Sequence, residues 1–126
     1  MIFATALFAW LTLAGTPDAR EEAIRSTQGD VEGYAYDTNV GLRRNGVTWG
    51  IVDAVGAGRC RTKFLLEEDH AVTVDWSAVT GVRGVKYEVE LLARKPADTV
   101  AFELDLEDQA RNFGEVFAYL VDACRG

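Results

Sequence analysis

The chain contains two cysteines, Cys60 and Cys124, and the patterns around them predict one disulfide between a sheet and a helix. Residues 59–66 are expected to form a strand in which Cys60 and Thr62 share the inward face, because strand side chains alternate. Cys124 lies on the apolar stripe of an expected C-terminal helix. Both sulfurs are therefore expected in one buried layer. Closing a loop of about 65 residues restricts the unfolded chain by roughly 4 kcal/mol.

The first fifteen residues carry no charged side chain and give way abruptly to a charged segment that begins at Asp18. This profile is typical of a signal peptide, and the apolar run is shorter than the roughly 20 residues that a membrane span needs. We expect residues 1–19 to be the leader, with cleavage after Ala14 or after Ala19. The mature protein is then periplasmic or secreted, with no membrane span. An apolar N-terminal strand and an uncleaved anchor are the alternatives.

The formal net charge of −7 makes the protein acidic. Nucleic acids and anionic lipid headgroups both require a basic surface, so neither is expected as a partner. A protein partner is expected, and it should be basic if electrostatics govern the contact. No motif indicates a cofactor. Gly56 and Gly58 lack the third glycine and the following helix of a dinucleotide site.

Residues 20–126 are expected to form a single α+β domain. A short helix begins at Thr16–Pro17 and ends near Gly29, and Val31–Tyr36 is a weak first strand. Residues 37–46 form a loop with two turn signals. Further strands are expected from alternating apolar residues over 47–54, 59–66, 72–76, 79–82, 85–91 and 100–104.

The spacing of apolar residues changes from two to about three and a half after Asp105. Asp105 or Asp108 is expected to cap the resulting helix, because acidic residues complement its N-terminus. One stripe of this helix carries Ala110, Phe113, Phe117, Leu120, Val121 and Cys124. Such a stripe must cover an apolar sheet face.

The run Val74–Val82, the amphipathic hairpin after it and the final helix resemble the pleckstrin-homology-like (PH-like) superfold. The resemblance covers Val31 to Cys124 and implies a strongly bent antiparallel sheet of about six or seven short strands, capped by one C-terminal amphipathic helix. The sequence is also similar to small exported proteins of proteobacteria that end in an aromatic helix and a cysteine. Neither group has an invariant catalytic motif, so the resemblance implies a fold rather than an activity.

Some PH-like domains bind phosphorylated lipids through a basic loop between their first two strands, and Arg43 and Arg44 occupy a comparable place. Phosphate sites usually gather several cations, so we expect a solvated turn here instead. Tyr34 and Tyr36 share a face of the weak first strand and are candidates to line a groove. The aromatic residues expected in the core are Trp49, Trp76, Phe113, Phe117 and Tyr119.

His70 is the single histidine, so any histidine-based catalysis depends on it. It follows the polar run Glu67–Asp69, which is typical of an exposed turn, and one imidazole does not supply the three protein ligands of a catalytic zinc site. We therefore expect no metal site and a non-enzymatic, exported binding or structural module. The alternatives are a small periplasmic inhibitor of a cationic enzyme and a small hydrolase that uses His70 as its base.

Overall fold

A computed structural model describes residues 17–125. The elements in chain order are α2 (Pro17–Asp37), β1 (Val40–Arg44), β2 (Val47–Gly56), β3 (Arg61–Leu66), η1 (Glu67–Asp69), β4 (Ala71–Asp75), η2 (Trp76–Ala78), β5 (Val79–Val85), β6 (Glu88–Ala93), η3 (Pro96–Asp98), β7 (Val100–Leu104) and α3 (Glu107–Cys124). The predicted leader lies outside the described residues except for its last three, which belong to α2. No helix in the range 17–125 is long and apolar enough to cross a bilayer.

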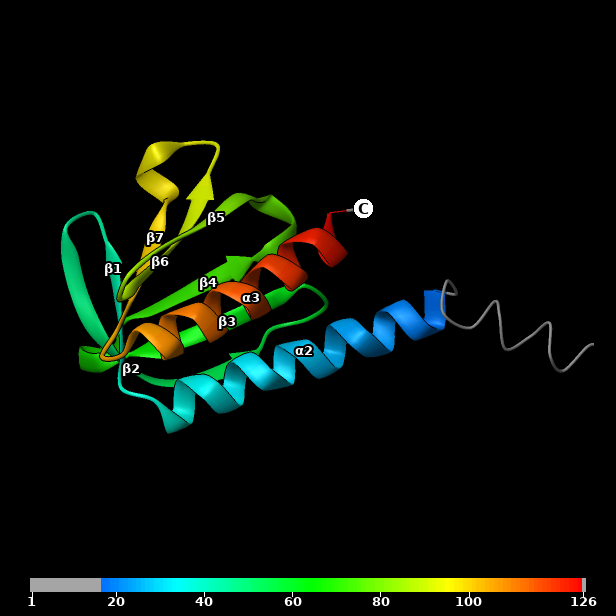
Figure 1. Ribbon diagram of the computed structural model, residues 1–126, viewed down its shortest axis with the longest axis horizontal. Helices are drawn as coiled ribbons and strands as arrows, with labels where there is room; N and C mark the ends of the chain where they lie inside the picture. Colours follow the sequence, from blue (N-terminus) through cyan, green and yellow to red (C-terminus); the bar gives the residue numbers. More distant parts are fainter. Residues whose placement is uncertain (1–16, 126) are drawn as a thin grey trace, which may run out of the picture.

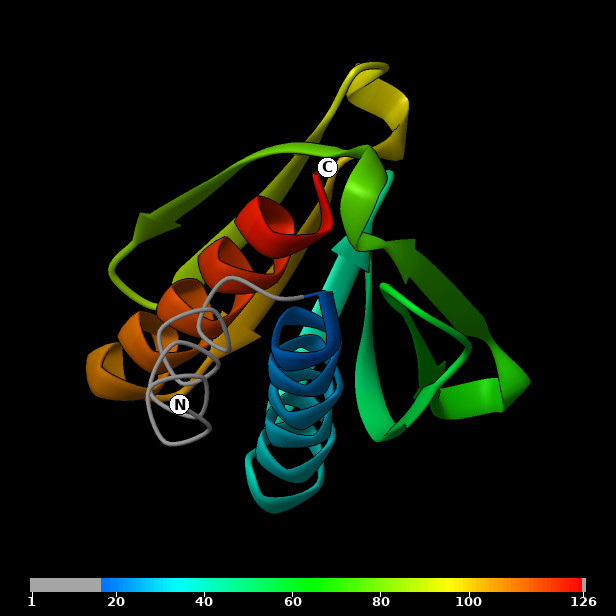
Figure 2. The same ribbon diagram turned by 90° about the vertical axis from the view of Figure 1, so that its right-hand side faces the viewer.

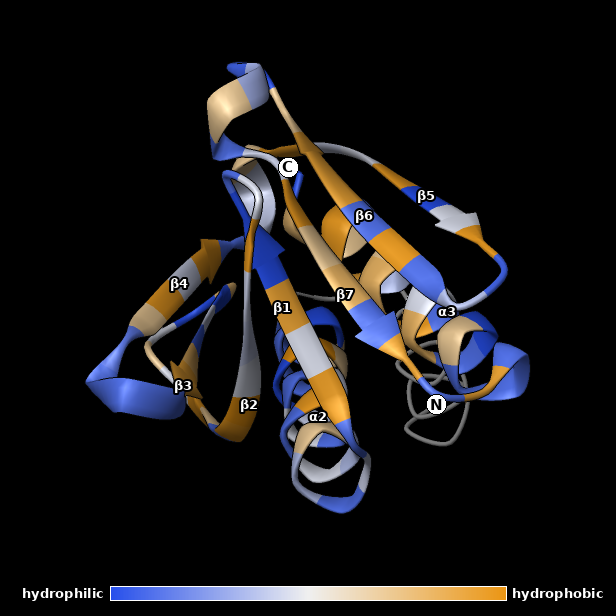
Figure 3. Ribbon diagram, turned by 90° about the vertical axis from the view of Figure 1, so that its left-hand side faces the viewer, coloured by the Kyte–Doolittle hydropathy of each residue, from blue (hydrophilic) through white to orange (hydrophobic). Residues whose placement is uncertain are grey.

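The strands form one antiparallel sheet with the order β4-β3-β2-β1-β7-β6-β5, which leaves β4 and β5 at its two edges. The sheet curls into a half-barrel, as predicted from the PH-like resemblance (Figure 3). Helices α2 and α3 lie side by side on the concave side (Figures 1 and 2). Helix α3 also contacts β5, β6, β7 and η2, so it fills the half-barrel.

The core is centred on the aromatic rings that α3 inserts into the sheet. Phe117 is fully buried, and its ring centroid lies 4.8 Å from Phe102, 5.1 Å from Trp76 and 5.5 Å from Phe113. Every member of the predicted stripe on α3 is buried, which confirms that prediction. Helix α3 begins at Glu107 with Leu106 at its N-cap and no side-chain cap, so the predicted capping by Asp105 or Asp108 is wrong.

The predicted strand Val31–Tyr36 is wrong, because these residues continue α2 to Asp37. The helix begins at Pro17 as expected but does not end near Gly29. Its buried face carries Ile24, Gln28, Val31 and Ala35, at intervals of four, three and four residues. A polar residue in the stripe and glycines at exposed positions obscured this helical period.

Replacing Gly29 and Gly33 together by alanine should raise the free energy of unfolding by about 1–2 kcal/mol, because glycine weakens a helix interior relative to alanine. Both lie inside α2, and an added Cβ meets nothing within 4 Å at either position. Urea unfolding checks this result. The contrasting control is Gly46→Ala, which should destabilise because Gly46 has φ +80°. A loss of stability in the double variant would contradict the account of α2 as one continuous helix.

The predicted loop 37–46 is also wrong over most of its length, because it contains the central strand β1. This strand pairs with β2 on one side and with β7 on the other, and Val40 and Leu42 are buried. Only Asn45 and Gly46 form the turn, with φ values of 53° and 80°. This is the positive-φ Asn-Gly turn that a two-residue hairpin favours.

A hairpin turn divides the predicted strand 85–91. Lys86 has φ 50°, β5 ends at Val85 and β6 begins at Glu88. Val89 and Leu91 are buried as predicted, but Val85 and Tyr87 are 59% and 50% exposed, so the predicted inward alternation is wrong at these two positions.

A disulfide joins Cys60 to Cys124, with 5.9 Å between the two Cα atoms. Cys60 lies in the turn just before β3 with φ +60°, rather than within the strand as expected. The predicted inward face is confirmed nevertheless, since Cys60, Thr62, Phe64 and Leu66 are all buried.

Helix α2 holds the turn that carries Cys60 through the buried side chain of Gln28. Its Nε2 donates to the carbonyl oxygens of Arg61 at 2.8 Å and Gly58 at 3.3 Å, and its Oε1 accepts from the Cys60 amide at 3.0 Å. Near the other cysteine, Arg20 on α2 donates to the Ala123 carbonyl at 2.8 Å. Helix α2 therefore forms hydrogen bonds next to both cysteines of the disulfide.

Gln28→Ala should lower the free energy of unfolding by about 2 kcal/mol, because a buried donor or acceptor left without its partner costs about 1–3 kcal/mol. Thermal or urea unfolding measures the change. Ser26→Ala, at an exposed position of the same helix, is the matched control and should change stability by less than about 0.5 kcal/mol. Equal effects of the two substitutions would show that Gln28 does not support the turn.

Candidate functional site

A pocket of about 750 Å³, which we call the corner pocket, lies beside the η2 turn that connects the two edge strands β4 and β5. Its walls come from β4, η2 and the start of β5 on one side, and from the end of β6 and the β6–β7 hairpin on the other. This volume is within the range of about 300–1,000 Å³ that ligand sites occupy. Apolar lining comes from Val72, Val74, Val79, Leu91 and Val100.

Four cations line this corner pocket: Arg44, Arg94, Lys95 and Arg125. They reach it from the end of β1, from the β6–β7 hairpin and from the residue after α3. Two carboxylates, Asp75 and Asp98, also line it, so four positive and two negative side chains give a formal charge of +2. The site is thus locally cationic in a chain of net charge −7.

The two carboxylates are already engaged by neighbouring groups. Asp75 Oδ1 accepts from the amide of Ser77 at 3.0 Å and from its hydroxyl at 2.6 Å. Asp98 Oδ1 lies 3.6 Å from Nη2 of Arg44. Among the described residues, the side chains of Arg94, Lys95 and Arg125 form no ion pair. Three cations therefore remain available to an anion.

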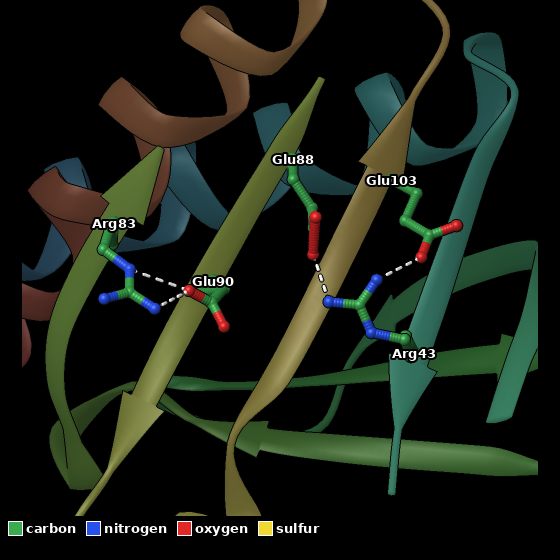
Figure 4. Close-up of polar contacts among 5 residues, drawn as sticks. All are labelled: Arg43, Arg83, Glu88, Glu90 and Glu103. Carbon is green, nitrogen blue, oxygen red and sulfur yellow. Dashed lines mark hydrogen bonds and ion pairs between the residues drawn. The ribbon is translucent and has the colours of Figure 1, made fainter. Parts of the chain in front are cut away.

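Arg43 and Arg44 are adjacent in sequence but differ in what binds them. Arg43 on β1 forms ion pairs with Glu88 on β6 and Glu103 on β7 (Figure 4). The two glutamates are register partners on these neighbouring strands. The hydrogen bond to Glu88 raises the pKa of Arg43 above its ordinary value, partial burial opposes this, and the bond to Glu103 raises it further. Figure 4 also shows Arg83 bound to Glu90 on the same face. Arg43 is thus neutralised by a charged network across β1, β7 and β6.

Arg44 keeps unused hydrogen-bonding capacity. Its Nε is buried without a partner, and the distance from its Nη2 to Asp98 exceeds that of a normal hydrogen bond. Of the two arginines that resemble a phosphate-binding loop, only Arg44 therefore faces the pocket with free donors. Phosphate capture by the pair is not supported, because Arg43 has two carboxylate partners.

His70 lies on the surface just after η1. Its ring packs against Trp49 with 4.8 Å between centroids. The nearby carboxylate of Glu67 accepts from the Gly50 amide at 2.8 Å. Within residues 17–125, no three histidine, cysteine or acidic side chains are grouped to hold a metal.

Tyr34 and Tyr36 do not line a groove on a strand, because both lie on α2. Tyr34 packs on Phe113 with 5.7 Å between ring centroids, and Tyr36 is 73% exposed. Of the predicted core aromatics, Trp76, Phe113 and Phe117 are buried, Trp49 is half-buried and Tyr119 is exposed. The assignment of Tyr119 to the core is therefore wrong.

Sequence reasoning missed the corner pocket because its cations are separated along the chain. No role was expected for Arg94 or Lys95, and Arg125 follows the end of the last helix. The signal available in the sequence was the positive charge at a hairpin and at a helix end in an otherwise acidic protein. Only the sheet order places these two positions near Arg44.

The fold is that of the PH-like superfold, an α+β architecture in which a curled antiparallel sheet is closed by a C-terminal helix. Solved structures of this class match most of the chain. A structure titled "PH domain from TgAPH" has a TM-score of 0.60 at 12% identity and covers 82% of this chain and 98% of its own. A "PH domain from PfAPH" has a TM-score of 0.62 at 8% identity, over 86% of this chain and 93% of its own.

Inner Membrane Complex Sub-compartment Protein 3 from Toxoplasma gondii also matches, with a TM-score of 0.57 at 8% identity, over 80% of this chain and 87% of its own. At these identities the comparisons show a shared fold alone. No protein-family model matches the chain, and neither does any curated protein sequence. The resemblance to exported proteins of proteobacteria stays a prediction.

Proposed function

We propose that this protein is an exported, non-enzymatic binding module that holds an anionic ligand in the corner pocket. The observation that carries the proposal is the gathering of Arg44, Arg94, Lys95 and Arg125 around an apolar floor in an acidic protein. Guanidinium and ammonium groups bind carboxylates and phosphates through charge-assisted hydrogen bonds. The apolar lining adds affinity for a ligand that carries carbon as well as charge.

Export is supported by the first fifteen residues, which carry no charged side chain, and by the disulfide, since such bonds persist in oxidising compartments. Intact mass of the protein recovered from its own cell tests this part. The polypeptide should begin at Gly15 or Arg20, and reduction should add the mass of two hydrogen atoms. Recovery of the full chain from the cytoplasm with both thiols free would contradict export.

Calorimetric titration with citrate tests the anion site. The oxidised protein should bind this small carboxylate, and the variant with Arg94, Lys95 and Arg125 all replaced by alanine should bind it at least about tenfold more weakly. The matched control replaces Arg25, Lys63 and Arg111, which are exposed and lie outside the pocket. This control loses the same charge and should keep the affinity.

Binding should weaken as salt is raised, because counterions screen the cations. If both triple variants lose affinity equally, citrate responds only to overall charge and the pocket is not a site. If the oxidised wild-type protein does not bind citrate at low salt, the proposal fails outright.

A further inference from the structure

The corner pocket is bordered by a free sheet edge as well as by cations. Strand β4 pairs with β3 alone and lies at the end of the sheet. Its residues from Val72 to Asp75 all line the pocket. An edge strand presents a row of backbone donors and acceptors that another chain can use.

The register of β3 with β4 identifies which backbone groups face outward. The amide of Trp76 donates to the Cys60 carbonyl at 2.8 Å, and the amide of Leu66 donates to the His70 carbonyl at 2.8 Å. Hydrogen-bonded pairs alternate with non-bonded pairs in an antiparallel ladder. The bonded partners between these two ends are Val74 opposite Thr62 and Val72 opposite Phe64.

The intervening residues Thr73 and Asp75 therefore turn their N–H and C=O groups away from β3. Thr73 therefore offers both its N–H and its C=O, and Asp75 offers its N–H, with no backbone partner on that side within residues 17–125. The Asp75 carbonyl belongs to η2, because Asp75 is the N-cap residue of that turn. Thr73 and Asp75 are both part of the pocket wall, so their free backbone groups border the same space as the cations.

We propose that the ligand of the corner pocket is an extended acidic peptide that adds as a strand to the free edge of β4. This inference rests on the proposed function, because it names the ligand of the same anion site. Main-chain bonds to Thr73 and Asp75 fix the peptide alongside β4, and its alternate side chains point to opposite faces. The peptide side chains on one face contact apolar residues such as Val72 and Val79. Those on the other face are acidic and contact Arg94, Lys95 and Arg125.

Charge complementarity within the pocket selects an acidic peptide, whereas the net charge of −7 on the whole chain had led to the expectation of a basic partner. Three of the four cations have no ion pair among the described residues, and both carboxylates already accept hydrogen bonds or lie against Arg44. The five residues of β4 span about 16 Å at roughly 3.3 Å per residue, which matches a peptide of about five residues.

The test uses an acetylated and amidated pentapeptide in which glutamate alternates with valine, titrated into the oxidised protein. A control peptide of the same sequence and charge carries N-methyl groups on alternate amides, which removes its strand hydrogen bonds. The plain peptide should bind at least about tenfold more tightly than the methylated one. At saturation, hydrogen exchange of the Thr73 and Asp75 amides should slow at least about tenfold, while that of Lys63 should not.

A pair of variants tests the edge itself. Thr73→Pro removes an outward N–H without removing a bond to β3, as an edge strand tolerates, and should reduce peptide affinity at least about tenfold while citrate binding persists. Thr73→Val keeps the N–H and should keep the affinity. If Thr73→Pro does not fold, the methylated peptide still decides the result.

The outcomes separate this inference from the proposed function. Equal binding of plain and methylated peptides would overturn strand addition and leave the anion site in place. Loss of both citrate and peptide binding would overturn both. A free protein that is dimeric, with Thr73 and Asp75 amides already protected and no response to peptide, would show that the edge pairs with a second copy, and the peptide proposal would be wrong.

Discussion

Replacing Cys60 and Cys124 together by alanine should lower the free energy of unfolding by about 4 kcal/mol, measured by urea denaturation. The bridge closes a loop with a sequence separation of 64 residues, so it removes many conformations from the unfolded chain. Alanine avoids placing new polar groups in the core, since both cysteines are buried.

Reduction of the wild-type protein should produce a similar loss, because both treatments remove the same constraint. A double variant as stable as the oxidised wild type would show that the bridge does not form in solution. The pocket is expected to weaken along with the fold, because Cys124 immediately precedes Arg125, and the Cys60 carbonyl accepts from Trp76 at the start of η2.

Phe117→Ala should destabilise the protein by about 3–5 kcal/mol, as large-to-small aromatic substitutions in a core do. Phe117 is fully buried among Phe102, Phe113 and Trp76, so its removal leaves a cavity between α3 and the sheet. Thermal unfolding followed by circular dichroism measures the effect.

The matched control is Tyr119→Ala on the same helix. Tyr119 is 45% exposed and should cost less than about 1 kcal/mol. A Phe117→Ala variant that loses no more stability than this control would contradict the packing of α3 against the sheet.

The sequence predicted the second half of the fold well because local pattern and burial agree there. Thr62, Phe64 and Leu66 on β3, Val72 and Val74 on β4, and Val100, Phe102 and Leu104 on β7 alternate and are buried as their spacing indicates. The stripe on α3 was predicted residue by residue. In each case one face of the element is apolar and the other carries most of the polar residues, which fixes both the period and the direction of burial, although Ala101 on the second face of β7 is buried as well.

The first half was predicted poorly because tertiary contacts decide it. Gln28 is a polar member of the buried face of α2, since its side chain is satisfied by the backbone of the turn around Cys60. Gly41 resembles a loop residue but lies in β1, where Thr48 Cγ2 comes within 3.1 Å of the position of an added Cβ. The turn around Cys60 and Thr48 are both distant in sequence from the residues that they contact, so a short window of sequence around Gln28 or Gly41 does not reveal them.

The candidate site depends even more strongly on topology. Its cations come from residues 44, 94, 95 and 125, and they meet because β1, the β6–β7 hairpin and the end of α3 converge. The adjacent arginines Arg43 and Arg44 can be read from the sequence. The sequence does not show that Arg43 is neutralised by two glutamates while Arg44 keeps free donors. The strand register causes this difference between the two arginines, because it pairs Glu88 with Glu103 next to Arg43.

Amide chemical shifts of the oxidised protein, followed during a citrate titration, locate the anion site. If the corner pocket is the anion site, the largest changes fall at residues 92–95, 98 and 125, which border it. Changes centred instead on Arg43 and Arg83, across the outer face of β5, β6, β7 and β1, would contradict this location.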